Sequence, residues 1–269
     1  MKHGNLFDSH VHINSSIYKK ENITVEDYIQ ENVEGGVKYY INVCTELNEV
    51  DELIKSTTKY KHLYCSVGVH PLNVKKLLTD DEINWLKELI NKNEKIVAIG
   101  ETGLDYFHVK DGSAKKLQQE VFIQQLKLAS VCKKPVIIHC REAWDDAYKI
   151  VSQFKGSVVG VLHCFTGTLK DAENFIKLGF YVSFAGQLTF NNKKIDELRK
   201  VFLEIPLTHI LTETDGPYLA PSPYRGQLNK SKYLNLLVSK MAEIKNLSPQ
   251  QITKTTSFNA KKLFLSHLF

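Results

Sequence analysis

The sequence predicts an α/β protein that folds as a single (β/α)8 TIM barrel spanning residues 1–269. Three observations point to this fold. Short runs of β-branched and apolar residues alternate eight times with longer stretches of helical periodicity. The runs are apolar on both faces, as expected of parallel strands that are covered by helices. No linker or low-complexity tract divides the chain, and eight such alternations in this length are typical of a closed barrel.

The strands are expected in short segments rich in valine, isoleucine and aromatic residues. They lie at residues 5–10, 38–44, 62–68, 95–101, 135–140, 158–163, 180–184 and 208–213. An open, doubly wound sheet is the alternative arrangement of the same elements. It is disfavoured because no strand is followed by a glycine-rich phosphate-binding motif.

The helical signals are clearest in three of the intervening segments. Thr79 and Glu82 have the spacing of a capping box, which predicts a helix start at this point. Residues 113–132 and 191–204 carry apolar side chains at helical spacing. The segment after the eighth strand contains three prolines and is expected to be a long irregular loop.

Composition limits the classes of protein to which the chain can belong. With 43% hydrophobic and 24% charged residues, it can bury a core and is not intrinsically disordered. The net charge of +5 is compatible with an anionic substrate but too small for a protein that coats DNA. The five cysteines form no C-x-x-C pair, so neither a disulfide framework nor a structural zinc site is expected. Without a transmembrane stretch or a signal peptide, we expect a cytoplasmic protein with no obligate protein partner.

Residue types that bind metal ions stand at the carboxyl ends of the predicted strands, where TIM barrels build their active sites. His10 and His12 are two residues apart in extended backbone, so both imidazoles project to one face and can bind one ion. The other members of this set are Asp8, His70, Glu101, His139, His163, Glu213 and Asp215. Clustered carboxylates and imidazoles need a cation to compensate them. Because the set exceeds what one tetrahedral ion binds, a two-metal site is favoured.

Each of these residues also has a structural interpretation when taken alone. A histidine that ends a buried strand is commonly a hydrogen-bonded structural residue. Glu101 is compatible with a charge at a helix N-terminus, and Asp215 with a turn. Cys140 and Cys164, each beside a histidine, are expected to be small buried side chains rather than ligands. It is the coincidence of several such strand ends that favours metal binding.

Several short motifs follow one another in a characteristic order along the chain. They are residues 8–12 (DSHVH), 68–71 (GVHP), 100–106 (GETGLDY), 138–143 (IHCREA), 163–167 (HCFTG), 213–219 (ETDGPYL), 225–226 (RG) and 259–264 (NAKKLF). Their set and order resemble the TatD-type metal-dependent deoxyribonucleases, a family of the amidohydrolase-like barrels. The resemblance covers essentially the whole chain.

This resemblance implies a divalent-metal-dependent nuclease that hydrolyses DNA phosphodiesters, with a preference for 3′ ends. It implies two ions, one held by His10, His12 and Asp215, the other by His139 and His163, with Glu101 between them. The chain has Gly216 and Cys140 where the family usually has serine, and Ser231 where it usually has proline. No ligand position is lost.

The expected mechanism is attack of a water molecule, activated by the two ions, on a phosphodiester of single-stranded DNA. Asp215 is the candidate general base, with Glu101 as the second catalytic carboxylate. His70 is expected to contact the phosphate or the leaving oxygen. Mg²⁺, Mn²⁺ and Zn²⁺ all remain candidates for the ions.

Candidate substrate-binding residues lie beside the same motifs. Arg141 and Arg225 can each match two phosphate oxygens, with surface ion pairing as the alternative role. Tyr106 and Phe165, together with their neighbours Phe107 and Tyr218, can stack on unpaired bases. Packing in the core is the alternative for these aromatic residues, and it is strongest for Phe165.

Two other functions stay open on sequence grounds. The same metal constellation activates water for attack on an amide, a lactone or an ester. A barrel without catalytic activity that binds nucleic acid is the other alternative. The full set of ligand types argues against the inactive barrel, because buried, uncompensated carboxylates and imidazoles would destabilise it.

Overall fold

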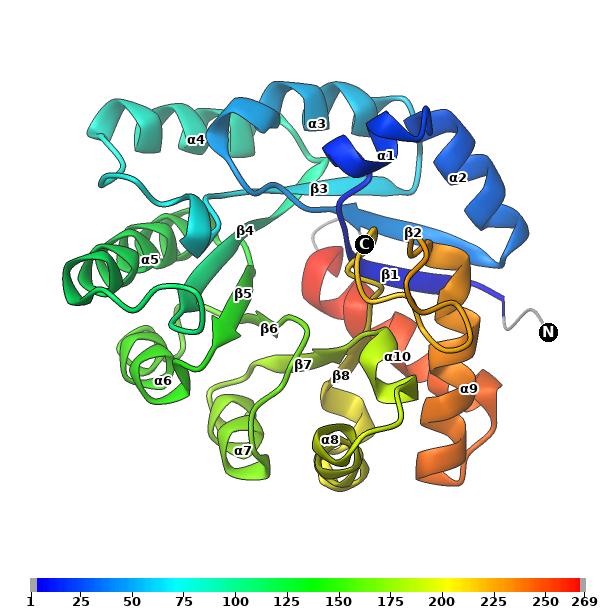
Figure 1. The fold of residues 1–269 in the computed structure, drawn as a ribbon. Helices are drawn as coiled ribbons and strands as arrows, with labels where there is room; N and C mark the ends of the chain where they lie inside the picture. The colour runs from blue at the N-terminus through cyan, green and yellow to red at the C-terminus, as the bar shows by residue number, and fades with distance from the viewer. Residues whose placement is uncertain (1–3, 267–269) are drawn as a thin grey trace.

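The computed structural model describes residues 4–266, in which eight parallel strands form a nearly closed barrel surrounded by helices (Figure 1). The strands are β1 (Leu6–Val11), β2 (Val37–Asn42), β3 (Leu63–Val67), β4 (Ile96–Asp105), β5 (Val136–Arg141), β6 (Gly160–Leu162), β7 (Tyr181–Phe184) and β8 (Ile210–Thr212). Each strand pairs in parallel with the next one along the chain. The predicted fold and all eight predicted strands are confirmed, and β4 continues beyond its expected end.

Helices connect the strands and cover the outside of the barrel (Figure 1). They are α1 (Ser16–Lys20), α2 (Val25–Glu34), α3 (Val50–Thr58), α4 (Asp80–Lys92), α5 (Gly112–Cys132), α6 (Trp144–Ser152), α7 (Leu169–Lys177), α8 (Lys193–Glu204), α9 (Leu234–Lys245) and α10 (Pro249–Phe264). At the start of α4, the Thr79 hydroxyl accepts the backbone N–H of Glu82, and the Glu82 carboxylate accepts that of Thr79. The predicted capping box is therefore confirmed.

Apolar side chains fill the barrel in two separate layers. The inner layer consists of Phe7, Tyr39, Ile41, Tyr64, Val97, Ala98, Ile137, Val161, Tyr181 and Leu211, together with Val43 just beyond β2. Residues from Ala260 to Leu265, at the end of α10, pack against this layer. Because they close the barrel at the amino ends of its strands, polar residues can gather at the other end. A larger outer layer lies between the strands and the helices.

Strands β1 and β8 are joined in a different way from the other pairs of neighbouring strands. Among the described residues, their segments form a single isolated bridge, between Val11 and Gly216. Asp215 donates its backbone N–H to the His10 carbonyl at 2.9 Å, and His12 donates to the Gly216 carbonyl at 2.8 Å. The barrel is thus closed by the same segments that carry three of the predicted metal ligands.

No helix within residues 4–266 is both long enough and apolar enough to cross a membrane. All five cysteines are free. Cys140 is buried, as the sequence predicts, whereas Cys164 is only partly buried.

Candidate metal centre

Six titratable side chains meet at the carboxyl end of the barrel. They are His10, His12, Glu101, His139, His163 and Asp215, and the structure groups them in overlapping clusters that can hold metal ions, together with His70. β1 carries His10 near its carboxyl end, and β8 leads to Asp215, as predicted. Glu101 instead lies inside β4, which continues for four residues beyond it. His10 and Glu101 are almost completely buried.

Glu101 lies in the middle of this cluster, and its two oxygens face different histidines. Its Oε2 lies 3.3 Å from His10 Nε2 and 3.8 Å from His12 Nε2. Its Oε1 lies 3.1 Å from His139 Nδ1 and 3.2 Å from His163 Nε2. One carboxylate therefore joins two groups of nitrogen donors, which is the geometry that lets a carboxylate lie between two ions.

Asp215 completes the group on the Oε2 side. Its Oδ1 lies 3.5 Å from His12 Nε2 and 3.8 Å from His10 Nε2. The two histidine nitrogens themselves are only 3.1 Å apart. A divalent cation with nitrogen and oxygen ligands fits this donor set, since it would relieve the close approach of the two ring nitrogens.

The hydrogen bonds around three histidines fix the ring nitrogen that is free to bind a cation. His12 Nδ1 lies 3.1 Å from the Val43 carbonyl, which can only accept, so Nε2 keeps its lone pair. His163 Nδ1 lies 3.2 Å from the Glu213 carboxylate, so here too Nε2 is free. These free nitrogens are the ones that face Glu101. Second partners of this kind are typical of metal-ligating histidines.

His139 is oriented in the opposite sense. Its Nε2 lies 3.1 Å from Asp105 Oδ2, so Nδ1 is the free nitrogen and faces Glu101. Asp105 also accepts hydrogen bonds from the ring and the backbone N–H of His108, both at 2.8 Å. Burial raises the pKa of Asp105, but the bonds from His139 and His108 lower it more, so the carboxyl is held in its charged form.

His70 belongs to the cluster but differs from these three histidines. Its Nδ1 accepts the backbone N–H of Leu72 at 3.1 Å, so in the neutral ring Nε2 carries the hydrogen. That Nε2 lies 3.3 Å from Glu101 Oε1. The neutral ring of His70 therefore presents a donor to the site, although His70 also belongs, with Glu101 and His139, to a group that could hold a metal ion.

The electrostatics of the cluster attract positive charge. Burial lowers the pKa of His163, but Glu213 and Glu101 raise it more and leave it well above its usual value. Burial raises the pKa of Glu101, but the surrounding imidazoles, His70 first, lower it well below its usual range. The carboxylates are thus charged, and a bound cation would replace the proton that His163 takes up. Burial instead lowers the pKa of His10 and His70.

Sequence and structure comparisons identify the family of this site. A family model described as TatD related DNase matches residues 7–265. The chain is 36% identical over 260 residues to "Uncharacterized metal-dependent hydrolase YabD" of Bacillus subtilis, covering 96% of this chain and 98% of that protein.

The chain belongs to the TatD-related DNase family.

It is accordingly a metal-dependent hydrolase of this family. It is also 29% identical over 264 residues to "3'-5' ssDNA/RNA exonuclease TatD" of Salmonella typhimurium, covering 96% of this chain and 98% of that protein. Among solved structures, YJJV, a TatD homologue of Escherichia coli, superposes with a TM-score of 0.87 at 27% identity. That match covers 97% of this chain and 98% of the other.

Asp8 lies in a different place in this TatD-family protein from the one its spacing indicates. It is fully buried and accepts hydrogen bonds from the backbone and hydroxyl of Thr214 and from the hydroxyl of Ser231. Burial raises the pKa of Asp8 to about 7, even though these bonds lower it. Asp8 therefore ties the segment after β8 to β1, and it also accepts the backbone N–H of His10 at 3.4 Å.

Two departures from the family pattern have a local explanation. A Cβ atom on Gly216 would lie 2.7 Å from Tyr18 Oη, so the absence of a side chain accommodates that tyrosine. Ser231 donates its hydroxyl to Asp8 and its backbone N–H to Tyr28 Oη, at 2.9 Å. Proline could make neither bond.

The predicted substrate residues on β4 and β5 are only partly available. Arg141 is exposed, and its guanidinium lies 4.0 Å from the centre of the Phe107 ring. Tyr106 is half-buried, and its hydroxyl bonds to Asp146 and Gln119. Burial raises the pKa of Tyr106 to about 12. The exposed ring on this rim is therefore Phe107, 43% exposed, rather than Tyr106.

The base-stacking role expected for Phe165 is wrong. Its side chain is completely buried and packs against Trp144 and Phe184. It is a core residue, as the alternative interpretation allowed. Arg225 is exposed and stacks on Phe190 at 4.1 Å, without an ion-pair partner among residues 4–266. It remains a candidate phosphate contact at the rim.

The sequence analysis assigned no role to Asp105 and His108, and none to Glu213 beyond membership of the cluster. The sequence did contain a signal for Asp105. It follows Glu101 by four residues on one strand and therefore faces the same side. His108 is exposed, and its ring bonds to Asp105.

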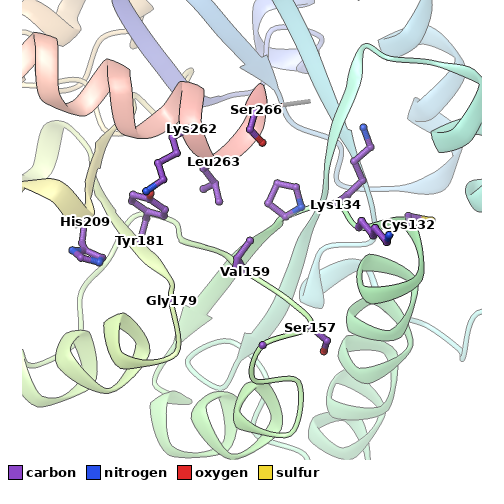
Figure 2. A pocket seen from close by; sticks show the side chains of 13 residues that line it. Cys132, Lys134, Ser157, Val159, Gly179, Tyr181, His209, Lys262, Leu263 and Ser266 are labelled. Carbon is purple, nitrogen blue, oxygen red and sulfur yellow. The ribbon is translucent and has the colours of Figure 1, made fainter. Parts of the chain in front are cut away.

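A cavity of about 680 Å³ lies far from this centre, between the amino ends of β5 to β8 and α10 (Figure 2). Lys134, Tyr181, His209 and Lys262 are among its lining residues. None of the predicted site residues borders it.

Proposed function

We propose that this protein is a divalent-metal-dependent 3′→5′ exonuclease that hydrolyses phosphodiester bonds at the ends of single-stranded DNA. The observation that carries this proposal is the position of Glu101, whose two oxygens face different histidines of the cluster. Two ions held side by side suit phosphoryl chemistry, because attacking and leaving oxygens both need compensation. The name of the Salmonella relative supports the choice of substrate.

The ligands proposed for the two ions follow from the free nitrogens and carboxylates. His10, His12 and Asp215 would hold one ion, His139 and His163 the other, and Glu101 would lie between them. When bound, Mg²⁺, Mn²⁺ or Zn²⁺ would supply Lewis acidity, which favours ionisation of water and offsets charge on the phosphoryl oxygens.

The other steps fall to the chain's own side chains. Burial raises the pKa of Asp215, but the bond from His12 and the nearby imidazoles lower it below its usual value. The carboxylate is therefore ionised at neutral pH and can accept the proton of the attacking water as general base. His70 Nε2–H is placed to donate to a phosphate or leaving oxygen. Arg141, exposed on the rim, can bind a flanking phosphate.

The test uses single-stranded oligonucleotides labelled at either the 3′ or the 5′ end. Protein freed of metal by a chelator is loaded separately with Mg²⁺, Mn²⁺ or Zn²⁺, and shortening of each label is followed with time. We expect loss from the 3′ end that depends on metal and is abolished by His10→Ala or Asp215→Asn. The control is Glu197→Gln, which changes an exposed ion pair with Lys200 on α8.

The same experiment separates the alternatives. Metal-loaded protein that leaves both labels intact would contradict the nuclease proposal. Turnover of amides, lactones or esters in that case would favour the hydrolase alternative, and DNA binding without any cleavage would favour the inactive barrel. The cytoplasmic location, the lack of an obligate partner protein and the preference for DNA over RNA stay predictions.

A further inference from the structure

A polar cavity adjoins the metal centre at the mouth of the barrel. It lies between the segments that follow β1, β2 and β8, and His12, Asn14, Ser16, Thr45 and Tyr218 are among its lining residues. Its volume of about 320 Å³ is at the small end of the range for small-molecule sites, ~300–1,000 Å³. We infer that this cavity binds the terminal nucleoside of the strand, with Tyr218 as the ring on which its base stacks. The inference rests on the proposed exonuclease function.

The cavity and the centre share His12. One ring nitrogen of His12 faces Asp215 and Glu101, whereas the other bonds to the Val43 carbonyl, and Val43 also lines the cavity. A phosphate bound at the centre would therefore have one attached nucleoside at the cavity. No intervening element would need to move.

The lining is polar and held in place by hydrogen bonds. Fully buried Asn42 accepts the backbone N–H of Ile13 and donates to Asn14 Oδ1, while Asn14 donates its amide to Glu52. Ser16, which also lines the cavity, is exposed, so its hydroxyl is accessible to a ligand. Such amides and hydroxyls match the polar edges of a base and its sugar, and do not suit an apolar ligand.

Tyr218 is a large aromatic side chain that the fold leaves 52% exposed at this cavity. Its backbone N–H bonds to the Asp215 carbonyl at 2.9 Å, which fixes it to a proposed ligand. The ring meets His12 edge-on, with 6.5 Å between the centroids. An exposed ring in this position can stack on any base, which suits an enzyme without strict sequence preference.

The rest of the DNA strand would bind to another part of the barrel rim. The cavity has room for one nucleoside and not for two, so a polymer can place only its end there. Phe107, in the turn after β4, and Arg141, at the end of β5, lie across the barrel, where they present an exposed ring and a cation to the following nucleotides. The groove beside α6 is lined by Glu142, Asp145 and other acidic residues and would repel phosphates. This arrangement would restrict cleavage to the end of a strand.

The test compares Tyr218→Ala and Tyr218→Phe on two oligonucleotides, one with a normal terminal nucleotide and one whose terminal nucleotide lacks its base. We expect Tyr218→Ala to raise KM for the normal strand by roughly 10- to 100-fold, the range of one lost base–aromatic stack, with a smaller change in kcat. Tyr218→Phe keeps the ring and should behave as wild type. On the strand without the terminal base, wild type and Tyr218→Ala should have similar KM values. Phe258→Ala, which removes a 65% exposed ring on α10, is the matched control.

The outcomes distinguish this inference from the proposed function. If the wild-type protein cleaves neither strand, the exonuclease proposal fails and the subsite fails with it. If the wild type cleaves the normal strand and Tyr218→Ala does so with an unchanged KM, only the subsite is overturned. The subsite is likewise overturned if Tyr218→Ala raises KM equally on both strands.

Discussion

Replacing Asp105 by asparagine is expected to weaken binding of one metal ion while leaving the other almost unchanged. In the structure, Asp105 Oδ2 lies 3.1 Å from His139 Nε2 and so leaves His139 Nδ1 free to face Glu101. An asparagine amide can present its NH₂ group to Nε2, and the ring proton then moves to Nδ1. His139 would lose its lone pair toward the centre, but His10 and His12 would keep theirs.

The magnitude follows from the role of such second partners. Loss of an orienting carboxylate typically reduces metal affinity or activity by 10- to 100-fold, or about 1.4–2.7 kcal/mol. Calorimetric titration of the metal-free protein with Mn²⁺ should resolve two binding steps in the wild type. Only one step should weaken in Asp105→Asn, and the cleavage rate should fall at a limiting Mn²⁺ concentration.

Matched variants make this result specific. Glu213→Gln removes the corresponding partner of His163 and should weaken the same step. His108→Ala removes a neighbour of Asp105 but leaves its contact with His139, so its effect should be smaller. The reasoning is refuted if Asp105→Asn binds both ions as the wild type does and keeps its rate within about twofold of the wild-type rate.

Three further predictions follow from single contacts. His70→Ala should lower kcat by roughly 10²–10⁴-fold. Because Nε2 of His70 carries a hydrogen, the number of ions bound in the titration should not change, and loss of an ion would contradict this prediction. Phe165→Ala should lower the free energy of unfolding by about 3–5 kcal/mol in urea melts and leave KM unchanged, whereas a raised KM would restore its stacking role. Burial raises the pKa of Glu31, but the bonds from Lys230 and Lys232 lower it more, so this carboxylate stabilises the fold above its ordinary pKa, and the contribution is lost as the pH falls. Glu31→Gln should therefore lower the unfolding free energy by up to about 1 kcal/mol at pH 7 and by less at pH 3, and an equal loss at both pH values would contradict the assignment.

The barrel could be predicted from the sequence because its signal is periodic and repeated. Every strand is a short apolar run, and the ligand types recur at strand ends, so errors at single positions did not alter the fold. The site residues His10, Glu101 and His139 were predictable for the same reason, since parallel strands bring their carboxyl ends to one rim.

The placement of individual side chains beyond the strand ends could not be predicted in this way. Two-residue alternation puts Phe165 on the same side as His163, but Cys164 between them has φ of 45°, which breaks the alternation and turns Phe165 into the core. Asp8 does share a face with His10, but a spacing of two residues also sets it about 6.6 Å deeper in the barrel. Periodicity predicts on which face of a strand a residue lies, but not how deep it lies in the barrel.

The way in which β1 meets the segment after β8 has a consequence for biosynthesis. Bonds such as that from Thr214 to Asp8 join residues 206 positions apart in the chain, and the proposed ligands His10 and Asp215 are joined across the same junction. Contacts of such long sequence separation form late in folding. A nascent chain on the ribosome thus cannot assemble the centre until nearly all of the barrel has been synthesised. The hydrolase would therefore become active only after the segment that follows β8 has been synthesised.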